Sequence, residues 1–444
     1  MAPEDSIHRR RARELGLLSQ GAGGLLRSPT PATAAYQLPS QLEALVLCQR
    51  QSPETSEQGP PGQETPVRIT AGGDLGFSGR LAPRAGEEGA GPLDEIAPLL
   101  RRSDAAFANL ESPLPRNVPE GALFAGPPEA ANRLAAAGLN VLSLANNHAL
   151  DYGPDGLLTT LQGLHWARIS SVGAGEGGSA AHPVLTSPRH HEAGEILWLA
   201  TARTLEPAPP HGPCIWELQR EELLNAVTEA SERRRAGELS AIVVSIHFGY
   251  MFIDYPDPEQ RRLALEVAAA GADLVLAHHA HVLQGIEVVD SGPRRSVVCH
   301  NLGNLLFDWQ EGEIATTADI GPQRSGALLV FDLDAHGVAQ AFALPVWVED
   351  DMSLRWALGS RGEAVLDRLQ RLSEAFASPS WQQEFRRQRG ERNTGLAVAG
   401  LWKQIAQGHW GVLFSALRRL RPHHLTMLGS WLLGRVRRRA DESL

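Results

Sequence analysis

Apolar runs alternate with segments of helical spacing through the middle of the chain. Apolar runs that end at turn residues predict buried strands, and apolar positions three or four residues apart predict helices. Strands, with the turns that end them, are predicted at 67–77, 104–114, 139–148, 167–175, 195–201, 239–249 and 272–281. Helices are predicted between them, at 93–102, 127–138, 154–164, 219–236 and 258–271.

Four more strands are predicted after residue 282, without helices between them. They lie at 283–290, 296–306, 326–334 and 338–348. Alternating strands and helices are typical of layered α/β domains, because each crossover helix returns the chain to the same edge of the sheet. We therefore predict an α/β fold with a partly parallel sheet.

The pattern divides the chain into three parts. Residues 1–65 form an irregular N-terminal extension or linker rich in Pro, Gln, Glu and Ser, within which only "LEALVLC" (42–48) is predicted to be ordered. Residues 66–348 form the globular domain, and residues 349–444 form a helical, Arg-rich C-terminal extension.

One segment of the C-terminal extension has two interpretations. Residues 413–439 mix Leu and Trp with Arg at roughly helical spacing. Such a segment binds an anionic membrane surface or a protein partner. An Arg-rich helical hairpin that packs on the main domain explains the same pattern equally well.

Composition narrows the classes of function. The net charge of −10 over 444 residues argues against bulk nucleic-acid binding. Three widely spaced cysteines (Cys48, Cys214 and Cys299) give neither a zinc spacing nor a disulfide framework. No apolar run approaches the ~18 residues of a membrane span, and no secretory signal is recognisable, so we expect a cytoplasmic location.

The predicted strands end in side chains that bind metals. Carboxylates, amides and imidazoles follow five of them, at Asp74, Asn109–Glu111, Asn146–His148, His247 and His278–His281. α/β folds place their sites at the carboxyl ends of strands. Taken singly, each residue fits an ordinary turn or a solvated position. Together they predict a site for Mn²⁺, Fe²⁺ or Zn²⁺, and their number fits two ions better than one.

Seven segments, in this order, resemble the CapA family of poly-γ-glutamate capsule synthesis proteins, whose domain is similar to the calcineurin-like metallophosphoesterases. The segments are "GDLGF" (73–77), "ANLESPL" (108–114), "LANNHALDYG" (144–153), "GAG" (173–175), "SIHFGY" (245–250), "GADLVLAHHAHVLQGIE" (271–287) and "NLGNLLFD" (301–308). The resemblance implies a layered metallophosphoesterase-like β-sandwich flanked by helices, with the helical C-terminal extension outside the match.

The resemblance also implies roles for individual residues. It assigns two divalent ions to six ligands, with Glu111 bridging both: Asp74, Glu111, Asn147, His247, His279 and His281. It makes His148 the general acid that protonates a leaving oxygen, a role that suits imidazole near neutral pH. Asp151, three residues later, is placed to orient that imidazole. We leave His278 out of the ligand set.

Two functions remain open at this point. The first is a metal-dependent hydrolase of phosphoester-type or related bonds, acting on a small-molecule or polymer substrate. The second is a non-catalytic binding component of capsule polymer synthesis or export. The ligand set and His148 favour the hydrolase. The sequence does not identify the substrate.

Overall fold

The computed structural model describes most of the central part of the chain. The described ranges are 26–29, 38–49, 66–118, 122, 124–177, 183–190, 192–204, 212–291, 294–308 and 321–406. The chain divides into two compact units, the first made of residues 1–308 and 321–378, and the second of 309–320 and 379–444. The second unit contributes helix α10 (Ser380–Ala406) to the described residues. All other elements belong to the first unit.

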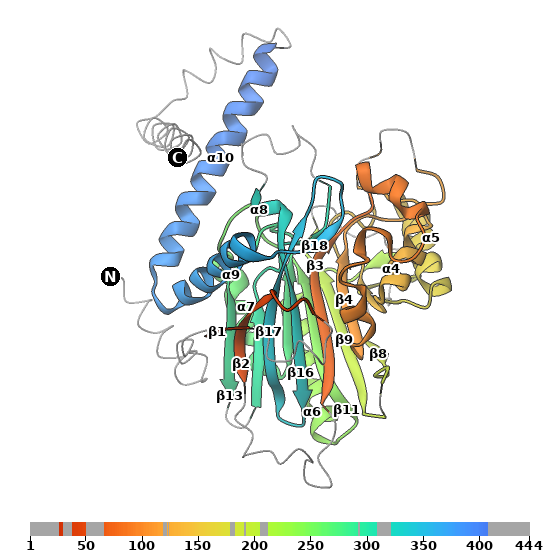
Figure 1. Ribbon diagram of the computed structural model, residues 1–444, viewed down its shortest axis with the longest axis vertical. Helices are drawn as coiled ribbons and strands as arrows, with labels where there is room; N and C mark the ends of the chain where they lie inside the picture. Colours follow the sequence, from red (N-terminus) through yellow and green to blue (C-terminus); the bar gives the residue numbers. More distant parts are fainter. Residues whose placement is uncertain are drawn as a thin grey trace. The chain divides into compact units, whose positions relative to one another are not determined.

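Within the described ranges, sixteen strands join into one sheet with two halves (Figure 1). The first half has the order β6 (Ser170–Val172), β5 (Val141–Ser143), β4 (Ala105–Leu110), β3 (Val67–Leu75), β16 (Ser325–Asp334) and β17 (Gly337–Val348). The second half has the order β14 (Arg294–Cys299), β12 (Leu274–His278), β11 (Leu239–His247), β9 (Glu195–Ala202) and β8 (Val184–Thr186).

Shorter strands extend both halves. β15 (Asn304–Leu306) pairs with β3, β18 (Leu354–Trp356) with β17, and β13 (Ile286–Ser291) with β14. β7 (Ala174–Gly175) and β10 (Cys214–Ile215) form a separate two-stranded sheet.

In the part of the chain that the structure describes, the ladder between the halves has one residue pair, Arg295 of β14 opposite Gly337 of β17. A Cβ on Gly337 would lie only 2.3 Å from the carbonyl oxygen of Arg295, and the glycine has a φ of +85°. Only glycine accommodates both conditions. The seam between the halves therefore depends on this residue.

The halves pack face to face. Phe107 of β4 stacks on Trp198 of β9, with ring centroids 5.3 Å apart and 13° between the ring planes. Since β4 and β9 belong to different halves, this contact lies between two layers of strands. The predicted α/β class with a layered β-sandwich is confirmed.

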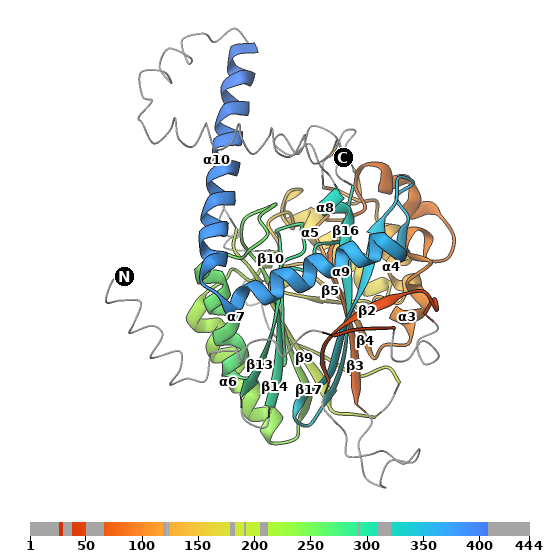
Figure 2. The same cartoon turned by 60° about the vertical axis from the view of Figure 1, so that its left-hand side comes forward.

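Helices cover the outer faces, as Figure 2 shows with α6 and α7 on one side of the strands and α3 and α4 on the other. The helices and 3-10 turns of the first unit are η1 (Gly79–Gly86), η2 (Gly91–Leu93), α3 (Ala97–Arg101), α4 (Ala130–Ala137), α5 (Gly153–Trp166), α6 (Arg220–Arg235), α7 (Pro258–Ala270), α8 (Gly321–Arg324), α9 (Gly359–Glu374) and η3 (Ala375–Ala377). Apolar residues of α6 and α7 form a core with β9, β11, β12 and β14.

Local sequence explains where helices begin and end. α7 begins at a capping box, in which the Asp257 carboxylate accepts a hydrogen bond from Glu259 N–H and the Gln260 side chain accepts one from Asp257 N–H. α4 ends at Gly138, as its sequence predicted, and this glycine has a φ of +102°.

The N-terminal segment is not irregular throughout. β2 (Glu43–Gln49) pairs with β17, and Leu42 and Leu45 beside and within it are buried. The prediction that residues 42–48 are ordered is therefore confirmed. Their strand belongs to the sheet and is not part of a linker. β1 (Leu26–Pro29) pairs with β2. The domain boundary at residue 65 stays a prediction.

The C-terminal part begins with sheet-associated structure. β18 pairs with β17, and α9 contacts β17 and β2. The helical character expected after residue 349 is present in α9 and α10. The amphipathic segment 413–439 lies outside the described residues. No described helix combines the length and the hydropathy that a membrane crossing requires.

Candidate metal centre

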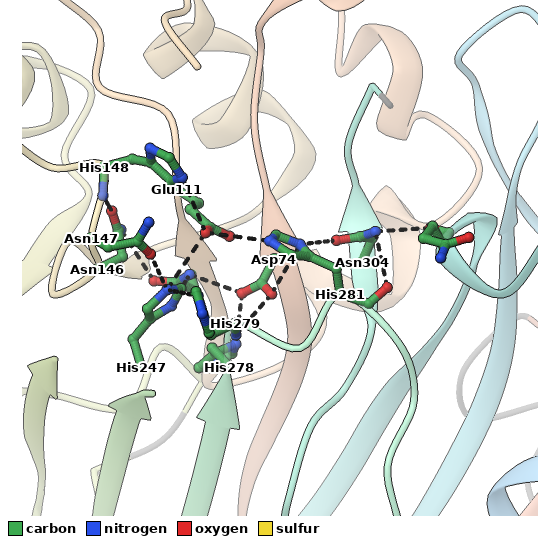
Figure 3. Close-up of polar contacts among 12 residues, drawn as sticks. Asp74, Glu111, Asn146, Asn147, His148, His247, His278, His279, His281 and Asn304 are labelled. Atoms are coloured by element: carbon green, nitrogen blue, oxygen red, sulfur yellow. Dashed lines mark hydrogen bonds and ion pairs between the residues drawn. The ribbon is translucent and has the colours of Figure 1, made fainter. Parts of the chain in front are cut away.

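The predicted ligands meet where parallel strands of both halves end (Figure 3). β3, β4 and β5 are parallel in the first half, and β11 and β12 are parallel in the second. Asp74 lies in β3 and Glu111 directly follows β4, whereas His247 ends β11. Neighbouring parallel strands deliver their ends to one edge, so two facing layers place these side chains opposite each other.

One group of potential ligand atoms comes from Asp74, Glu111 and His281, and these atoms lie within 4.8 Å of one another. His281 Nδ1 is 3.5 Å from Asp74 Oδ2, and its Nε2 is 3.5 Å from Glu111 Oε1. All three side chains are buried. Two carboxylates and an imidazole are suitable ligands for a divalent transition metal.

A second group comes from Glu111, His247 and His279. His247 Nε2 is 3.5 Å from Glu111 Oε1 and 3.1 Å from His279 Nδ1. Asn147 adds its amide oxygen, 2.7 Å from His247 Nε2. Glu111 is the side chain that these two groups share, so its carboxylate is in a position to bridge two ions.

The surroundings of the buried Glu111 carboxylate show whether these residues are suited to metal ions. Its side chain is 0% exposed, and neither carboxylate oxygen has a hydrogen-bond partner among the described residues. A buried charge without partners is costly, and coordination to a cation removes that cost. The carboxylate, amide and imidazole donors therefore fit divalent ions in both chemistry and placement.

The pKa values of the two carboxylates are shifted in opposite directions. Burial raises the pKa of Glu111. It acts in the same direction on Asp74, but the His278 imidazole 3.2 Å away and the charges of the other neighbouring histidines hold the pKa of Asp74 well below its ordinary value. Asp74 is therefore ionised over the whole physiological range, as a metal ligand must be.

The histidines also differ from one another. Burial, reinforced by the nearby His279, lowers the pKa of His247 well below its ordinary value, so His247 is neutral. Burial would also lower the pKa of His281, but Glu111 and Asp74 raise it to about 9. Neutral imidazole is the form that binds metal, so ion binding at His281 releases a proton.

The backbone of the last histidine loop is strained. His279 has a φ of +96° and His281 a φ of +54°, in the left-handed region that residues other than glycine avoid. His279 N–H donates to Asp74 Oδ2 at 3.1 Å, which fastens the loop to β3. Strained residues of this kind cluster at functional sites, where surrounding contacts hold them.

Three polar residues of the cluster are absent from the predicted site. Asn109 Nδ2 donates to Asp74 Oδ1 at 2.9 Å, and Asn304 Oδ1 lies 2.9 Å from His281 Nδ1. His278 Nδ1 lies 3.2 Å from Asp74 Oδ1. Such contacts orient ligands and leave His281 Nε2 facing Glu111. Asn109 and Asn304 lie in segments 108–114 and 301–308, which resemble the CapA family, and this resemblance was the sequence feature that could have identified them.

The two adjacent amides of the "NNH" sequence have different tasks. Asn146 Nδ2 donates to the carbonyl oxygen of Leu110 at 2.8 Å, and Asn146 Oδ1 accepts from His148 N–H at 3.1 Å. Asn146 thereby fastens the turn to the end of β4. Asn147 instead directs its oxygen to His247. The first amide is structural, and the second joins the ligand group.

His148 lies at the edge of the ligand cluster. Its Nδ1 is 2.8 Å from Asp151 Oδ2, the contact that the sequence spacing predicts. Its Nε2 is 3.9 Å from Glu111 Oε1, and its side chain is 19% exposed. The imidazole is therefore accessible from outside while its Nε2 lies near the ligands. The roles assigned to His148 and Asp151 stay predictions.

Comparison with solved structures gives a weak likeness. The sulfate thiohydrolase SoxB of Thermus thermophilus is 15% identical, with a TM-score of 0.34, over 68% of this chain and 49% of SoxB.

Comparison with known sequences is more informative. The capsule biosynthesis protein CapA of Bacillus anthracis is 27% identical over 57% of this chain and 61% of the relative. The PGA biosynthesis protein CapA of Bacillus subtilis is 26% identical over 57% of this chain and 64% of the relative. The family described as bacterial capsule synthesis protein PGA_cap matches residues 68–309, which include every predicted site residue. Because this match spans more than half of the chain, the protein belongs to the bacterial capsule synthesis protein family PGA_cap.

Proposed function

We propose that the protein is a metal-dependent hydrolase of phosphoester-type or related bonds that uses two divalent ions. The observation that carries the proposal is Glu111, a fully buried carboxylate without a hydrogen-bond partner in the described structure, shared by two ligand groups. A carboxylate shared by two ligand groups supports a pair of neighbouring ions, the arrangement found in two-metal centres that cleave phosphoesters.

The residues divide between the two ions. Asp74, Glu111 and His281 would hold one ion, and Glu111, Asn147, His247 and His279 the other. Two ions in these positions supply Lewis acidity toward a phosphoryl oxygen and lower the pKa of water.

His148 is the proposed general acid. The Asp151 carboxylate accepts a hydrogen bond from His148 Nδ1–H, so Nε2 is the nitrogen that exchanges a proton with substrate. Nε2 lies 3.9 Å from Glu111 Oε1, so a proton on Nε2 would be beside the ligand cluster. Protonation of the leaving oxygen then assists bond cleavage, most strongly when the leaving group is poor.

The proposed biological setting is the synthesis of a poly-γ-glutamate or other capsule polymer. It rests on membership of the PGA_cap family and on the two relatives named for capsule and PGA biosynthesis. The substrate is a small molecule or the polymer itself.

The test combines metal analysis with kinetics. Purified protein is assayed with phosphomonoesters, phosphodiesters and γ-glutamyl compounds, and its metal content is measured on the same samples. We expect Asn147→Ala to lose metal. We expect His148→Ala to keep metal and to lose ~10²–10⁴-fold in rate on an alkyl phosphate, with a smaller loss on nitrophenyl phosphate.

Two outcomes contradict the proposal. Loss of metal from His148→Ala would overturn the acid assignment. If the metal-loaded protein hydrolyses none of these substrates, the alternative role as a non-catalytic component of polymer synthesis or export is supported instead.

A further inference from the structure

Phe124 covers one face of the His148 imidazole. The two ring centroids lie 4.1 Å apart with 22° between the ring planes, a stacked arrangement. Phe124 lies between β4 and α4, whereas His148 follows β5, so the contact joins two separate segments. Phe124 lies outside every segment that pointed to the site from the sequence.

The stacked ring supplies a constraint that Asp151 alone cannot. The hydrogen bond to Asp151 holds one atom of the imidazole, Nδ1, at 2.8 Å. A single hydrogen bond to Nδ1 tolerates a range of angles, so it leaves the imidazole some freedom to turn about its Cβ–Cγ bond. The face of Phe124 blocks the turn, because rotation would drive the imidazole edge into it. The two contacts together fix the direction of Nε2.

Phe124 is itself held in place. Its φ of +52° lies in the left-handed region, which is unfavourable for a residue with a side chain. Such a conformation persists only where surrounding contacts enforce it. The Phe124 ring also contacts buried Phe307 at 5.9 Å, and Phe307 contacts His281 at 5.1 Å. Two residues later, Gly126 N–H donates to the carbonyl oxygen of Pro113 at 3.0 Å.

We propose that Phe124 is a positioning residue, which keeps the His148 imidazole in the one orientation that points Nε2 at the leaving group. Its effect on catalysis rests on the proposed function, whereas its effect on the orientation of the ring does not. Phe124 acts through His148 and is not assigned any contact with substrate.

The kinetic experiment uses Phe124→Leu, which removes the ring and keeps the apolar bulk, and Phe124→Trp, which restores a ring. Metal content and thermal unfolding are measured on each variant. For Phe124→Leu we expect kcat on an alkyl phosphate to fall about tenfold, part of the contribution of a general acid, with KM unchanged. We expect nitrophenyl phosphate to be little affected and Phe124→Trp to recover the rate.

A double-variant comparison separates positioning from other roles. In the His148→Ala background, Phe124→Leu should cause no additional loss of rate, because the ring that it positions is gone. An equal loss on both substrates, or an additional loss in the His148→Ala background, overturns the proposal.

An NMR experiment tests the orientation without any turnover. The ¹⁵N signals of the His148 ring, assigned by their absence in His148→Ala, should show a slowly exchanging Nδ1–H that becomes fast-exchanging in Phe124→Leu. The matched control is Phe252→Leu, another half-buried phenylalanine with a left-handed φ (+60°), whose ring faces His281 at 6.1 Å instead.

The NMR result also distinguishes the two proposals. Unchanged His148 signals in Phe124→Leu, or an equal change in Phe252→Leu, overturn the positioning role. A change confined to Phe124→Leu supports that role, even if no substrate is hydrolysed and the proposed function fails.

Discussion

Two buried glutamates of this protein, Glu111 and Glu287, have opposite surroundings. Their exposed fractions are 0% and 5%. Glu287 accepts hydrogen bonds from the Arg261 guanidinium at 2.7 and 2.5 Å, and its Oε1 lies 2.8 Å from His300 Nε2. Glu111 has no such partner within the described ranges. The protein surrounds Glu287 with hydrogen-bonded cationic partners, whereas Glu111 faces imidazoles at 3.5 Å or more, among them His281, whose pKa is raised to about 9.

The pKa values reflect this difference. Burial alone would raise the pKa of Glu287, but the hydrogen bonds from His300 and Arg261 outweigh burial and lower it to about 2. Burial raises the pKa of Glu111. Glu287, with its own hydrogen-bonded cations, is therefore part of the structural framework. Glu111, which has no hydrogen-bond partner among the described residues, instead belongs to both candidate ligand groups.

The largest expected effect is the loss of metal from Glu111→Gln. Substitution of residues that only orient metal ligands typically costs 10–100-fold in affinity, so removing a ligand shared by two ions should cost about 10³-fold or more. Titration of the metal-free variant with Mn²⁺ or Zn²⁺ measures it. Glu287→Gln, at the same burial, is the control and should bind metal like the original protein. Equal affinity in both variants would contradict the bridging role.

Glu287→Gln should instead lower the free energy of unfolding. The variant removes the carboxylate charge that pairs with the Arg261 guanidinium, and we expect a loss of about 3 kcal/mol at pH 7. Urea unfolding in the presence of a chelator measures the difference without any contribution from metal.

The pH dependence of that difference has a definite sign. Glu287 has a lower pKa in the folded state than its ordinary value of 4.5. Its stabilisation is therefore complete above pH ~4.5 and is lost as the pH falls toward 2. The gap between Glu287→Gln and the original protein should narrow over this interval. A gap that stays constant would show that the ion pair is not its cause.

The smallest expected effect concerns the stability of the metal-free protein. In chelator at pH 7, Glu111→Gln should change the free energy of unfolding by about 1 kcal/mol or less, because relief from burying a carboxylate is offset by the lost attraction to the His281 imidazole 3.5 Å away. Urea unfolding of the same metal-free samples measures it. A destabilisation as large as that of Glu287→Gln would mean that the protein itself compensates the charge of Glu111.

The candidate ligands, which stay predictions, could be selected from the sequence because they lie at or near the ends of recognisable strands. Asp74, Glu111 and His247 all come at the end of an apolar run, and parallel strands bring such ends together. The β-sandwich was predictable only through the family resemblance, since periodicity does not show which strands face each other.

Residues that depend on long-range pairing could not be predicted in the same way. Asn304 reaches the centre because β15 aligns it with Asp74, 230 positions earlier in the chain. β2 joins the sheet through β17, which lies almost 300 positions later. His278 ends a strand like His247, but local sequence does not reveal that it contacts Asp74. Phe124 has no polar side-chain group, so the search for metal ligands and catalytic residues in the sequence did not select it.

The short ladder between the halves, one pair in the described part of the chain, has a consequence for metal binding. Asp74, Glu111 and Asn147 come from one half of the sheet, whereas the three histidine ligands come from the other. Neither half holds a complete ligand group, so the two groups form only where the halves dock. An ion held by either group would therefore link the two halves and stabilise their docked arrangement.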